Sequence, residues 1–241
     1  MLHPVDAADL LVAEAVGADL ARRVFDIVAA ILALLVLMPL MLLVSLAILL
    51  ESGRPVLFCQ TRLGMGGQQF RLLKFRKFAA KSAPGSAVTV RSDPRMTRVG
   101  RLLERTKLDE LPQLWNILRG DMAVVGPRPE SLAFADCFAR GFYAVLDHKP
   151  GLFGPCQVIF RNEGALYREA FEAETYYRSV LFPLKARIDL DYFSRRSFTS
   201  DLRWIVLGVF AVVGLSSLSC RILPMGADLE GAVFLPGRSR A

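Results

Sequence analysis

Residues Ile27 to Leu50, IVAAILALLVLMPLMLLVSLAILL, form an uncharged apolar run that decides the architecture of the chain. As a straight helix the run would be about 36 Å long, which exceeds a bilayer hydrocarbon core of roughly 30 Å. It begins well inside the chain, is too long for the apolar part of a signal peptide, and lacks a small-residue cleavage site. The run therefore predicts a permanent membrane element.

Pro39 interrupts this run near its centre, with Ile27 to Met38 before it and Leu40 to Leu50 after it. Proline removes one backbone hydrogen bond and clashes with the preceding helical turn, so neither arm, roughly 16 to 18 Å long, can cross a bilayer alone. Two arrangements remain open: a kinked helix that crosses, or a re-entrant helix that leaves on the face it entered. Arginines on both sides favour the re-entrant form, because basic flanks are retained in the cytoplasm. They are Arg22, Arg23, Arg54 and Arg62.

Basic residues are concentrated directly after the apolar run. From Ser52 to Leu108 the chain has 13 Lys and Arg against Asp93 and Glu104, a net charge of +11, although the whole chain carries only +7. Such a block marks the cytoplasmic side and attracts anionic lipid. It also suits an anionic substrate. No nucleic-acid partner is expected, because the phenylalanines of this block alternate with apolar residues as in a core strand and no RNA- or DNA-binding signature accompanies them.

The predicted fold class is α+β and predominantly helical: a small cytosolic catalytic domain with a short β-hairpin, anchored by a proline-broken re-entrant membrane helix. Residues 55–76 are typical of two short strands around a glycine turn at Gly64 to Gly67, and helical patterning resumes near Thr97 and after Pro112. Residues 81–95 are expected to form a mobile loop. The uncharged stretch from Trp204 to Cys220 is short for a membrane span and favours a helix lying against the bilayer or packed on the domain.

Four segments follow from this pattern. An N-terminal amphipathic extension covers residues 1–21, the re-entrant membrane helix covers residues 22–51, the cytosolic domain with interfacial helices covers residues 52–224, and a tail covers residues 225–241. The four cysteines and two histidines fall at no metal-ligand spacing, so none of them is assigned a catalytic role.

Two adjacent carboxylates, Asp109 and Glu110, follow the basic block, and a Gly-Pro-Arg-Pro turn, Gly126 to Pro129, comes soon after them. Carboxylates beside cations suit chemistry on a phosphate, because one carboxylate can attack or hold a metal while the cations neutralise the phosphoryl oxygens. Neighbouring helical residues point about 100° apart, which favours divided labour over a shared proton. The alternative interpretation is structural: acidic residues complement a helix N-terminus, with Pro112 in its first turn.

The block from Thr106 to Glu130 resembles the signature of the bacterial sugar transferases that act as monotopic polyprenyl-phosphate phosphoglycosyl transferases. The resemblance begins at Arg22-Arg23-Val24-Phe25-Asp26 and runs through Asp201-Leu202-Arg203, about three quarters of the chain. In that family a proline-broken re-entrant helix is the hallmark, which favours this role for Pro39. The resemblance implies that Asp109 is the nucleophile and that Glu110 beside it is associated with Mg²⁺.

The resemblance also implies a two-step reaction. Asp109 would attack the sugar-bearing phosphate of a UDP-sugar, releasing UMP, and the aspartyl phosphosugar would then be attacked by a polyprenyl phosphate to give a polyprenyl diphosphate sugar. The expected partners are a UDP-sugar, a polyprenyl (undecaprenyl) phosphate and the lipid bilayer, with the catalytic domain on the cytoplasmic face of the bacterial inner membrane. The product would serve exopolysaccharide or glycoconjugate synthesis. A homodimer is left open.

Several further residues are expected to contribute. Arg128 stands between two prolines on a stiff turn, which suits a guanidinium that meets phosphate in a fixed geometry. Lys74 and Arg76 match a Lys-Phe-Arg element of the family. Asp26 borders the membrane run, where an acidic side chain needs a partner, and Arg22 or Arg23 is the candidate. The residues expected to bind substrate or its phosphates are Lys74, Arg76, Arg105, Arg128, Gln157 and Arg161.

Two positions depart from the family pattern. The position five before Asp109 is commonly Arg in the family and is Glu104 here, which puts phosphate or metal contacts in question. The family's Gly-Trp-Ala-Gln is Gly154-Pro155-Cys156-Gln157, so the identity of the sugar does not transfer. A different class of function is a non-catalytic membrane-anchored scaffold of a polysaccharide assembly system. Loss of Asp109 or Glu110 would favour it, and both are present.

Overall fold

The computed structural model of the protein describes residues 7–79, 93–161, 163–166 and 170–212. Most of the loop expected over residues 81–95, all of the tail at 225–241 and the last part of the segment 204–220 lie outside these described residues.

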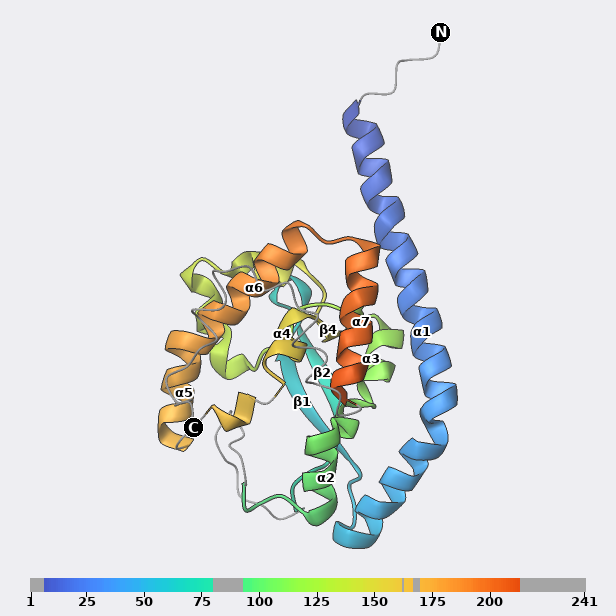
Figure 1. The fold of residues 1–241 in the computed structure, drawn as a ribbon, viewed down its shortest axis with the longest axis vertical. Helices are drawn as coiled ribbons and strands as arrows, with labels where there is room; N and C mark the ends of the chain where they lie inside the picture. Colours follow the sequence, from blue (N-terminus) through green and yellow to red (C-terminus); the bar gives the residue numbers. More distant parts are fainter. Residues whose placement is uncertain (1–6, 80–92, 162, 167–169, 213–241) are drawn as a thin grey trace, which may run out of the picture.

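Helix α1 (Ala7–Ser52) is 46 residues long and contains Pro39. Figure 1 shows α1 running along one side of the domain, projecting beyond it at the N-terminal end and bending inward at the C-terminal end. Its part from residue 17 to residue 52 is long and apolar enough to cross a membrane by length and composition, and an 18-residue window within it has a mean hydropathy of 3.1. The side of α1 that faces away from the domain is lined by exposed Leu35, Val36, Leu42 and Leu46.

The other side of α1 is buried against the domain. Ala30 is fully buried beside Leu114 and Ile117, and its small side chain allows the two helix backbones to approach closely. Further along, Val44 and Ile48 pack with Phe75 and Leu103 in a second cluster. A side chain as buried as Ile48, which is 1% exposed, contributes about 1.5–3 kcal/mol. One face of the apolar run therefore packs against the domain, and the opposite face is exposed.

Strands β1 (Leu57–Leu63) and β2 (Gln69–Phe75) form the predicted antiparallel hairpin, with Phe58 opposite Lys74 and Gln60 opposite Leu72. A short 3₁₀ turn, Met65–Gly67, joins them, and Gly66 and Gly67 have φ angles of 65° and 74° that side-chain-bearing residues rarely adopt. The glycines of the predicted turn are thus required by its backbone.

Two helices follow where helical patterning was predicted. Helix α2 (Arg98–Thr106) is capped by Thr97, whose Oγ1 accepts from the Gly100 N–H at 2.8 Å. Helix α3 (Gln113–Arg119) begins after Pro112 and ends at Gly120, which has a φ of 89°. Helix α3 packs along α1 and holds the segment between α2 and α3 against β2.

A second sheet was not predicted from the sequence. Strands β3 (Ala123–Val125) and β4 (Gly151–Phe153) pair in parallel, Ala123 with Gly151 and Val125 with Phe153. Each has three residues, which is too short to show a period-two pattern. This sheet matters because the Gly-Pro-Arg-Pro turn starts at the end of β3.

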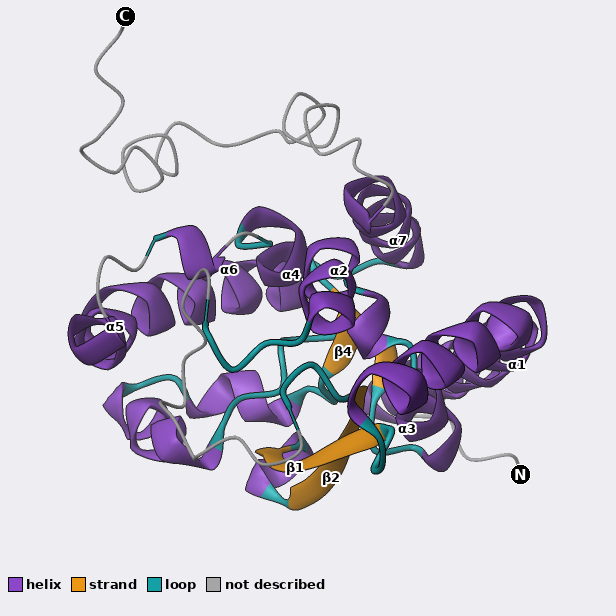
Figure 2. Ribbon diagram, turned by 90° about the horizontal axis from the view of Figure 1, so that it is seen from below, coloured by secondary structure: helices purple, strands orange, loops and turns teal. Residues whose placement is uncertain are grey.

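The later chain is helical and forms its own core around Phe134, Phe138, Tyr177 and Phe182. Figure 2 shows helices α5 (Ala170–Tyr176) and α6 (Phe182–Ser194) on the opposite side of the β1–β2 hairpin from α1. Helix α7 (Phe198–Val212) packs on β3 and β4, and Gly208 allows this contact, because a Cβ there would lie 2.3 Å from the Phe153 ring. The described part of the 204–220 segment is thus packed on the domain. The remaining elements are η3 (Leu132–Arg140), η4 (Tyr143–Asp147), α4 (Pro155–Ile159), η5 (Glu163–Ala165), α5 (Ala170–Tyr176), η6 (Tyr177–Leu181), α6 (Phe182–Ser194) and α7 (Phe198–Val212).

Candidate active site

The carboxylate pair lies on a single 3₁₀ turn, η2 (Leu108–Glu110), between α2 and α3. Lys107 stops α2 by adopting a left-handed conformation with a φ of 60°, and Pro112 then starts α3. A non-glycine residue with positive φ is uncommon and stores local strain. The turn points Asp109 and Glu110 in different directions, as divided labour requires, and the two carboxylates contact different lysines.

Asp109 is buried, with 1% of its surface exposed. Its Oδ2 lies 3.5 Å from the Nζ of Lys77, whereas its Oδ1 is buried and has no hydrogen-bond partner. An unpartnered buried carboxylate oxygen is costly, so such atoms in native proteins call for an explanation. The pKa of Lys77 is raised, because the charges of Asp109 and Glu104 outweigh the burial that would lower it. The nucleophile candidate therefore has one oxygen held by a cation and one oxygen free.

Glu110 is held by two cations. Its Oε1 accepts from the Nζ of Lys74 at 2.8 Å and lies 3.7 Å from an Nη of Arg128. Burial acts to raise the pKa of Glu110, but the charges of Lys74, Arg128 and Lys107 outweigh it and hold that pKa well below its usual range. Burial lowers the pKa of Lys74, and Glu110 partly offsets this. Glu110 is therefore a carboxylate at any physiological pH.

Arg128 reaches the site because the turn at Gly126 is unusually close to the neighbouring chain. A Cβ on Gly126 would lie 2.2 Å from the Lys149 carbonyl oxygen and 2.6 Å from the Gly151 nitrogen, so only glycine fits. The side-chain amide of Gln157 donates to the carbonyls of Gly126 and Gly151 at 3.0 and 3.1 Å. Gln157, predicted to bind substrate, is therefore placed where it supports the turn that carries Arg128.

The remaining predicted phosphate ligands are more dispersed. Arg76 is buried and donates to the Ser52 carbonyl, the Ser52 hydroxyl and the Gly53 carbonyl, so it ties the end of α1 to β2. Arg105 is exposed on α2, and its carbonyl accepts from an Nη of Arg161 at 3.0 Å. Burial lowers the pKa of Arg161, and the charge of Glu110 opposes this. The structure thus brings Lys74 and Arg128 onto Glu110, and joins the Arg161 side chain to the Arg105 carbonyl.

Two cationic residues of the site were missed by the sequence analysis: Lys77 and Arg62. A cavity with an empty volume of about 260 Å³ lies beside Glu110, and Asp109 is not among the residues that line it. Arg62 reaches it from β1, held by the Gln60 side chain at 2.8 Å, while its buried Nε has no hydrogen-bond partner. Because directly paired residues share a face of a hairpin, the alternation of Phe58, Gln60 and Arg62 was the signal that could have found it. The cavity is lined by Arg62, Leu72, Lys74, Glu110, Gln113, Arg128, Pro129, Gly151 and Leu152.

The donor set bears on the expected Mg²⁺. Within the described ranges, no group of three or more His, Cys, Asp and Glu side chains could hold a metal by itself. Mg²⁺ commonly takes one or two carboxylates together with substrate phosphates. Glu110 fits such a shared site, with the substrate completing it, and does not fit an all-protein one.

The membrane-side residues tie α1 to the elements that carry the site. Arg23 donates to the carbonyls of Ile117 and Leu118 at 2.7 and 2.8 Å, which satisfies the end of α3. The partner expected for Asp26 was Arg22 or Arg23. In the structure Asp26 Oδ1 accepts from the Val124 N–H at 2.9 Å, a strand-edge donor that α1 buries, and the charge of Arg23 also acts on Asp26.

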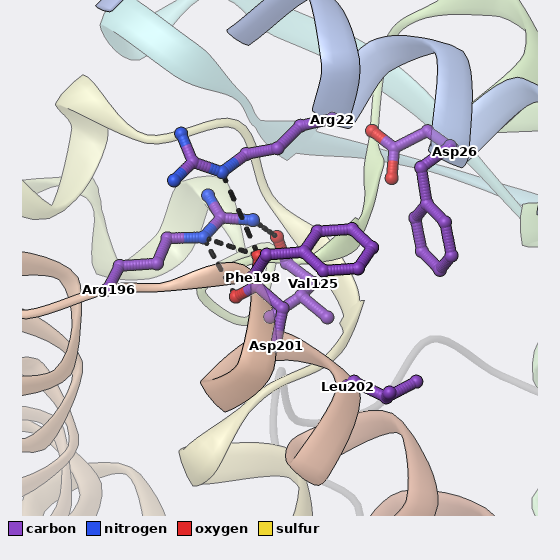
Figure 3. Close-up of a pocket in the computed structure, with 8 residues that line it drawn as sticks. Arg22, Asp26, Val125, Arg196, Phe198, Asp201 and Leu202 are labelled. Carbon is purple, nitrogen blue, oxygen red and sulfur yellow. Dashed lines mark hydrogen bonds and ion pairs between the residues drawn. The ribbon is translucent and has the colours of Figure 1, made fainter. Parts of the chain in front are cut away.

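Arg22 turns instead toward the start of α7. It donates to Asp19 at 3.2 Å, and its Nε lies 3.9 Å from Asp201. Figure 3 shows Arg22 and Arg196 converging on Asp201, with Arg196 also donating to the Val125 carbonyl. These contacts bring the start of α7 and the end of β3 together beside α1.

The two departures from the family pattern have different surroundings. Cys156 is 1% exposed, and its thiol donates to the Lys185 carbonyl at 3.2 Å, so it packs between α4 and α6. Glu104 lies beside the catalytic candidates, 3.5 Å from the Nζ of Lys77.

The chain matches the family model described as bacterial sugar transferase over residues 17–214, and it belongs to that family. It is 41% identical over 195 residues to a UDP-glucose:undecaprenyl-phosphate glucose-1-phosphate transferase of Caulobacter vibrioides, covering 79% of this chain and 69% of the relative. It is 42% identical over 142 residues to a UDP-N-acetylgalactosamine-undecaprenyl-phosphate N-acetylgalactosaminephosphotransferase of Aeromonas hydrophila, covering 57% and 34%. It is 50% identical over 109 residues to the exopolysaccharide production protein PSS of Rhizobium leguminosarum, covering 44% and 54%. The chain thus spans less than two thirds of the last two relatives.

Proposed function

We propose that the protein transfers a sugar 1-phosphate from a UDP-sugar to a polyprenyl phosphate and releases UMP. The observation that carries this proposal is Asp109: a buried carboxylate with one oxygen on Lys77 and the other free, beside a second carboxylate that binds Lys74 and Arg128. Family membership supports the same class of reaction, and relatives with different named sugars leave the sugar open.

The first step uses the free oxygen of Asp109. It forms a bond to the sugar-bearing phosphorus, the bond from that phosphorus to the bridging oxygen breaks, and UMP leaves with the electron pair. In the second step an oxygen of the polyprenyl phosphate attacks the same phosphorus and Asp109 is released as a carboxylate. The product is a polyprenyl diphosphate sugar, and no proton or electron has to be supplied from outside. Splitting the transfer in this way is ordinary covalent catalysis.

The cations and Glu110 have separate tasks in this scheme. Arg62, Lys74 and Arg128 line the cavity with one carboxylate, so a doubly charged diphosphate would balance their excess charge. Glu110 would hold Mg²⁺ together with the diphosphate, and the ion would supply neutralisation of the leaving phosphate. Gln113 offers a polar side chain on the same wall.

The polyprenyl phosphate keeps its head group at the membrane surface, so the active site must lie at that level. We propose that α1 is re-entrant, with its exposed apolar face in lipid, and that the domain lies on the cytoplasmic face of the inner membrane. The supporting features are Pro39 inside α1 and the basic flanks of the apolar run. Single cysteines at positions 10 and 120, in a chain freed of its own cysteines, should be labelled from the same side by an impermeant thiol reagent. Labelling from opposite sides would replace this arrangement with a kinked span.

The test of the chemistry is the stoichiometry of UMP release. Given UDP-sugar alone, the purified wild type should release at most about one UMP per active site and retain a phosphosugar on Asp109, because the second step needs the polyprenyl phosphate. Asp109→Asn should release none, whereas a panel of UDP-sugars with undecaprenyl phosphate and Mg²⁺ should identify the donor. If UMP appears only with both substrates and no adduct can be trapped, direct transfer through a ternary complex is the better account.

The alternative of a non-catalytic scaffold makes the opposite prediction. A scaffold would release no UMP with any UDP-sugar, and Asp109→Asn would support polysaccharide assembly in cells as well as the wild type does. The intact carboxylate pair with its cations favours the enzyme.

A further inference from the structure

Lys77 lies between two carboxylates that come from different elements. Its Nζ is 3.5 Å from Asp109 Oδ2 and 3.5 Å from Glu104 Oε1. The Lys77 side chain is 18% exposed and that of Glu104 is 30% exposed, whereas that of Asp109 is only 2% exposed. Lys77 therefore links a partly exposed carboxylate of α2 to the buried carboxylate of Asp109.

The backbone of Lys77 is held against the start of α2. The Lys77 carbonyl accepts from the Thr97 N–H at 3.0 Å, directly before α2. Gly100 brings α2 so close that a Cβ there would lie 2.0 Å from the same carbonyl oxygen. Glu104 stands one helical turn further along α2, which places it on the same face as Gly100. The contact between Lys77 and Asp109 can therefore break only if α2 moves or the Lys77 side chain adopts another rotamer.

The contact has a direction that matters for chemistry. Lys77 holds Oδ2 of Asp109, and the atom left without a partner is Oδ1. A carboxylate fixed through one oxygen presents the other in a single orientation, which is the preorganisation that a nucleophile needs. The ammonium also compensates a charge that burial would otherwise disfavour.

The contact between Glu104 and Lys77 explains why this chain can have glutamate at a position where the family commonly has arginine. A carboxylate at position 104 in place of that arginine would weaken phosphate binding unless another residue supplied the lost positive charge. Here the Glu104 carboxylate contacts the same ammonium group that contacts Asp109. The cation beside the nucleophile thus comes from the end of β2 in this chain.

We propose that Lys77 is the positioning residue that aims Asp109 at the phosphorus, and that Glu104 holds Lys77 in that position. The inference rests on the proposed function of Asp109 and concerns how the nucleophile is held. It assigns Glu104 an indirect role, in place of the direct phosphate contact that an arginine could make.

The inference predicts a graded set of losses in kcat. Lys77→Met keeps most of the length of the side chain and removes the charge. It should lower kcat about 10²-fold, as loss of one preorganised electrostatic group does. The KM for the UDP-sugar should stay within about threefold, because substrate binding is not the function removed. Glu104→Gln should cost about 2- to 5-fold, since a partly exposed ion pair contributes less. Lys77→Arg should retain most of the activity.

The decisive experiment removes the positive charge at position 77 and places a new one at position 104, where the family commonly has arginine. Lys77→Met combined with Glu104→Arg should regain at least about tenfold over Lys77→Met alone, because the arginine can reach Asp109 from α2. Lys77→Met combined with Glu104→Gln is the matched control and should regain nothing. Arg98→Met removes an exposed charge from the same helix and should leave kcat unchanged.

The assay is UMP release by the purified full-length chain with Mg²⁺, undecaprenyl phosphate and either UDP-glucose or UDP-N-acetylgalactosamine, whichever the wild type turns over. The rate of phosphosugar formation on Asp109 is measured in parallel by mass spectrometry, and a thermal melt shows that each variant is folded. Slow adduct formation in Lys77→Met with an unchanged melting temperature supports the inference.

Three results would overturn it. An unchanged rate of adduct formation in Lys77→Met would show that Asp109 needs no help from Lys77, while the proposed function would stand. A raised KM with an unchanged kcat would make Lys77 a substrate ligand. No gain from Glu104→Arg would remove the role assigned to Glu104. Absence of an adduct in the wild type would instead refute the proposed function itself.

Discussion

The close contact at Gly100 predicts a large effect from a single methyl group. In Gly100→Ala the new Cβ would stand 2.0 Å from the carbonyl oxygen of Lys77, 2.8 Å from its carbonyl carbon and 2.9 Å from its Cα. Ordinary contact begins at 3.4 Å, so α2 and the end of β2 must move apart to accept the methyl group. The atoms met are backbone atoms, which cannot rotate away.

The cost in folding free energy follows from two opposing effects. Overpacking a close contact costs typically 1–3 kcal/mol, and a backbone contact places this case near the upper end at about 3 kcal/mol. Alanine favours a helix over glycine by about 1 kcal/mol, which offsets part of that. The net loss of about 2 kcal/mol should lower the melting temperature by about 4–8 °C for a chain of this size. A shift of about 1 Å at Lys77 should also lower turnover, on the order of 10²-fold.

The measurement is a thermal melt of the purified protein in detergent together with UMP release. Gly17→Ala in α1 is the matched control, because beyond the adjoining backbone of its own helix no atom lies within 4 Å of the Cβ that it adds. It should melt at the wild-type temperature or slightly above and keep full activity. Gly100→Ala with a wild-type melting temperature and full turnover would refute the argument that this contact places Lys77.

Three further changes test other parts of the structure. Arg128→Ala should lower activity about 10²-fold or more and shift the melting temperature little, because the side chain is 37% exposed; full activity would return Arg128 to a surface charge. Burial raises the pKa of Asp189 to about 7, so the native state holds this proton more tightly than the unfolded chain and stability should fall as pH rises from about 4 to 7, with a slope of at most about 1.4 kcal/mol per pH unit. Melts at pH 5 and pH 8 should show this fall in the wild type and much less of it in Asp189→Asn; equal falls in both would exclude Asp189 as the source. Arg23→Met removes two charge-assisted hydrogen bonds to the end of α3 and should cost about 2–3 kcal/mol, and an unchanged melting temperature would show that α3 needs no anchor on α1.

The elements that the sequence predicted correctly are those encoded over short distances. The hairpin was predictable because alternation flanks a glycine turn, and two of those glycines have the positive φ angles that only such a turn needs. The start of α2 was predictable because Thr97 precedes a helical pattern. Sheet β3–β4 was missed because such short strands carry no period and the partner strand is far along the chain.

The candidate site shows the same division. Asp109, Glu110 and Arg128 stood out because carboxylates and a guanidinium between prolines are unusual neighbours in sequence. Lys77 did not stand out, because it is one of 13 basic residues in a solvated-looking block. Lys77 differs from the other basic residues because its Nζ lies 3.5 Å from Asp109. The two residues are separated in sequence by α2, so the sequence pattern does not reveal this contact.

The amino-acid sequence by itself determined the long apolar helix with its proline, the hairpin and the identity of the two carboxylates, because each depends on residues that are close along the chain. Only the tertiary structure decided which cation meets which carboxylate. Basic residues cannot be told apart by their position in a sequence pattern, because their roles depend on how deeply each side chain is buried and on which groups it contacts in the fold. Arg76 ties the end of α1 to β2, Lys74 binds Glu110 and Lys77 binds Asp109, although the three are near neighbours in sequence. The packing of α2 and α3 against the end of β2 assigns each of them its partner.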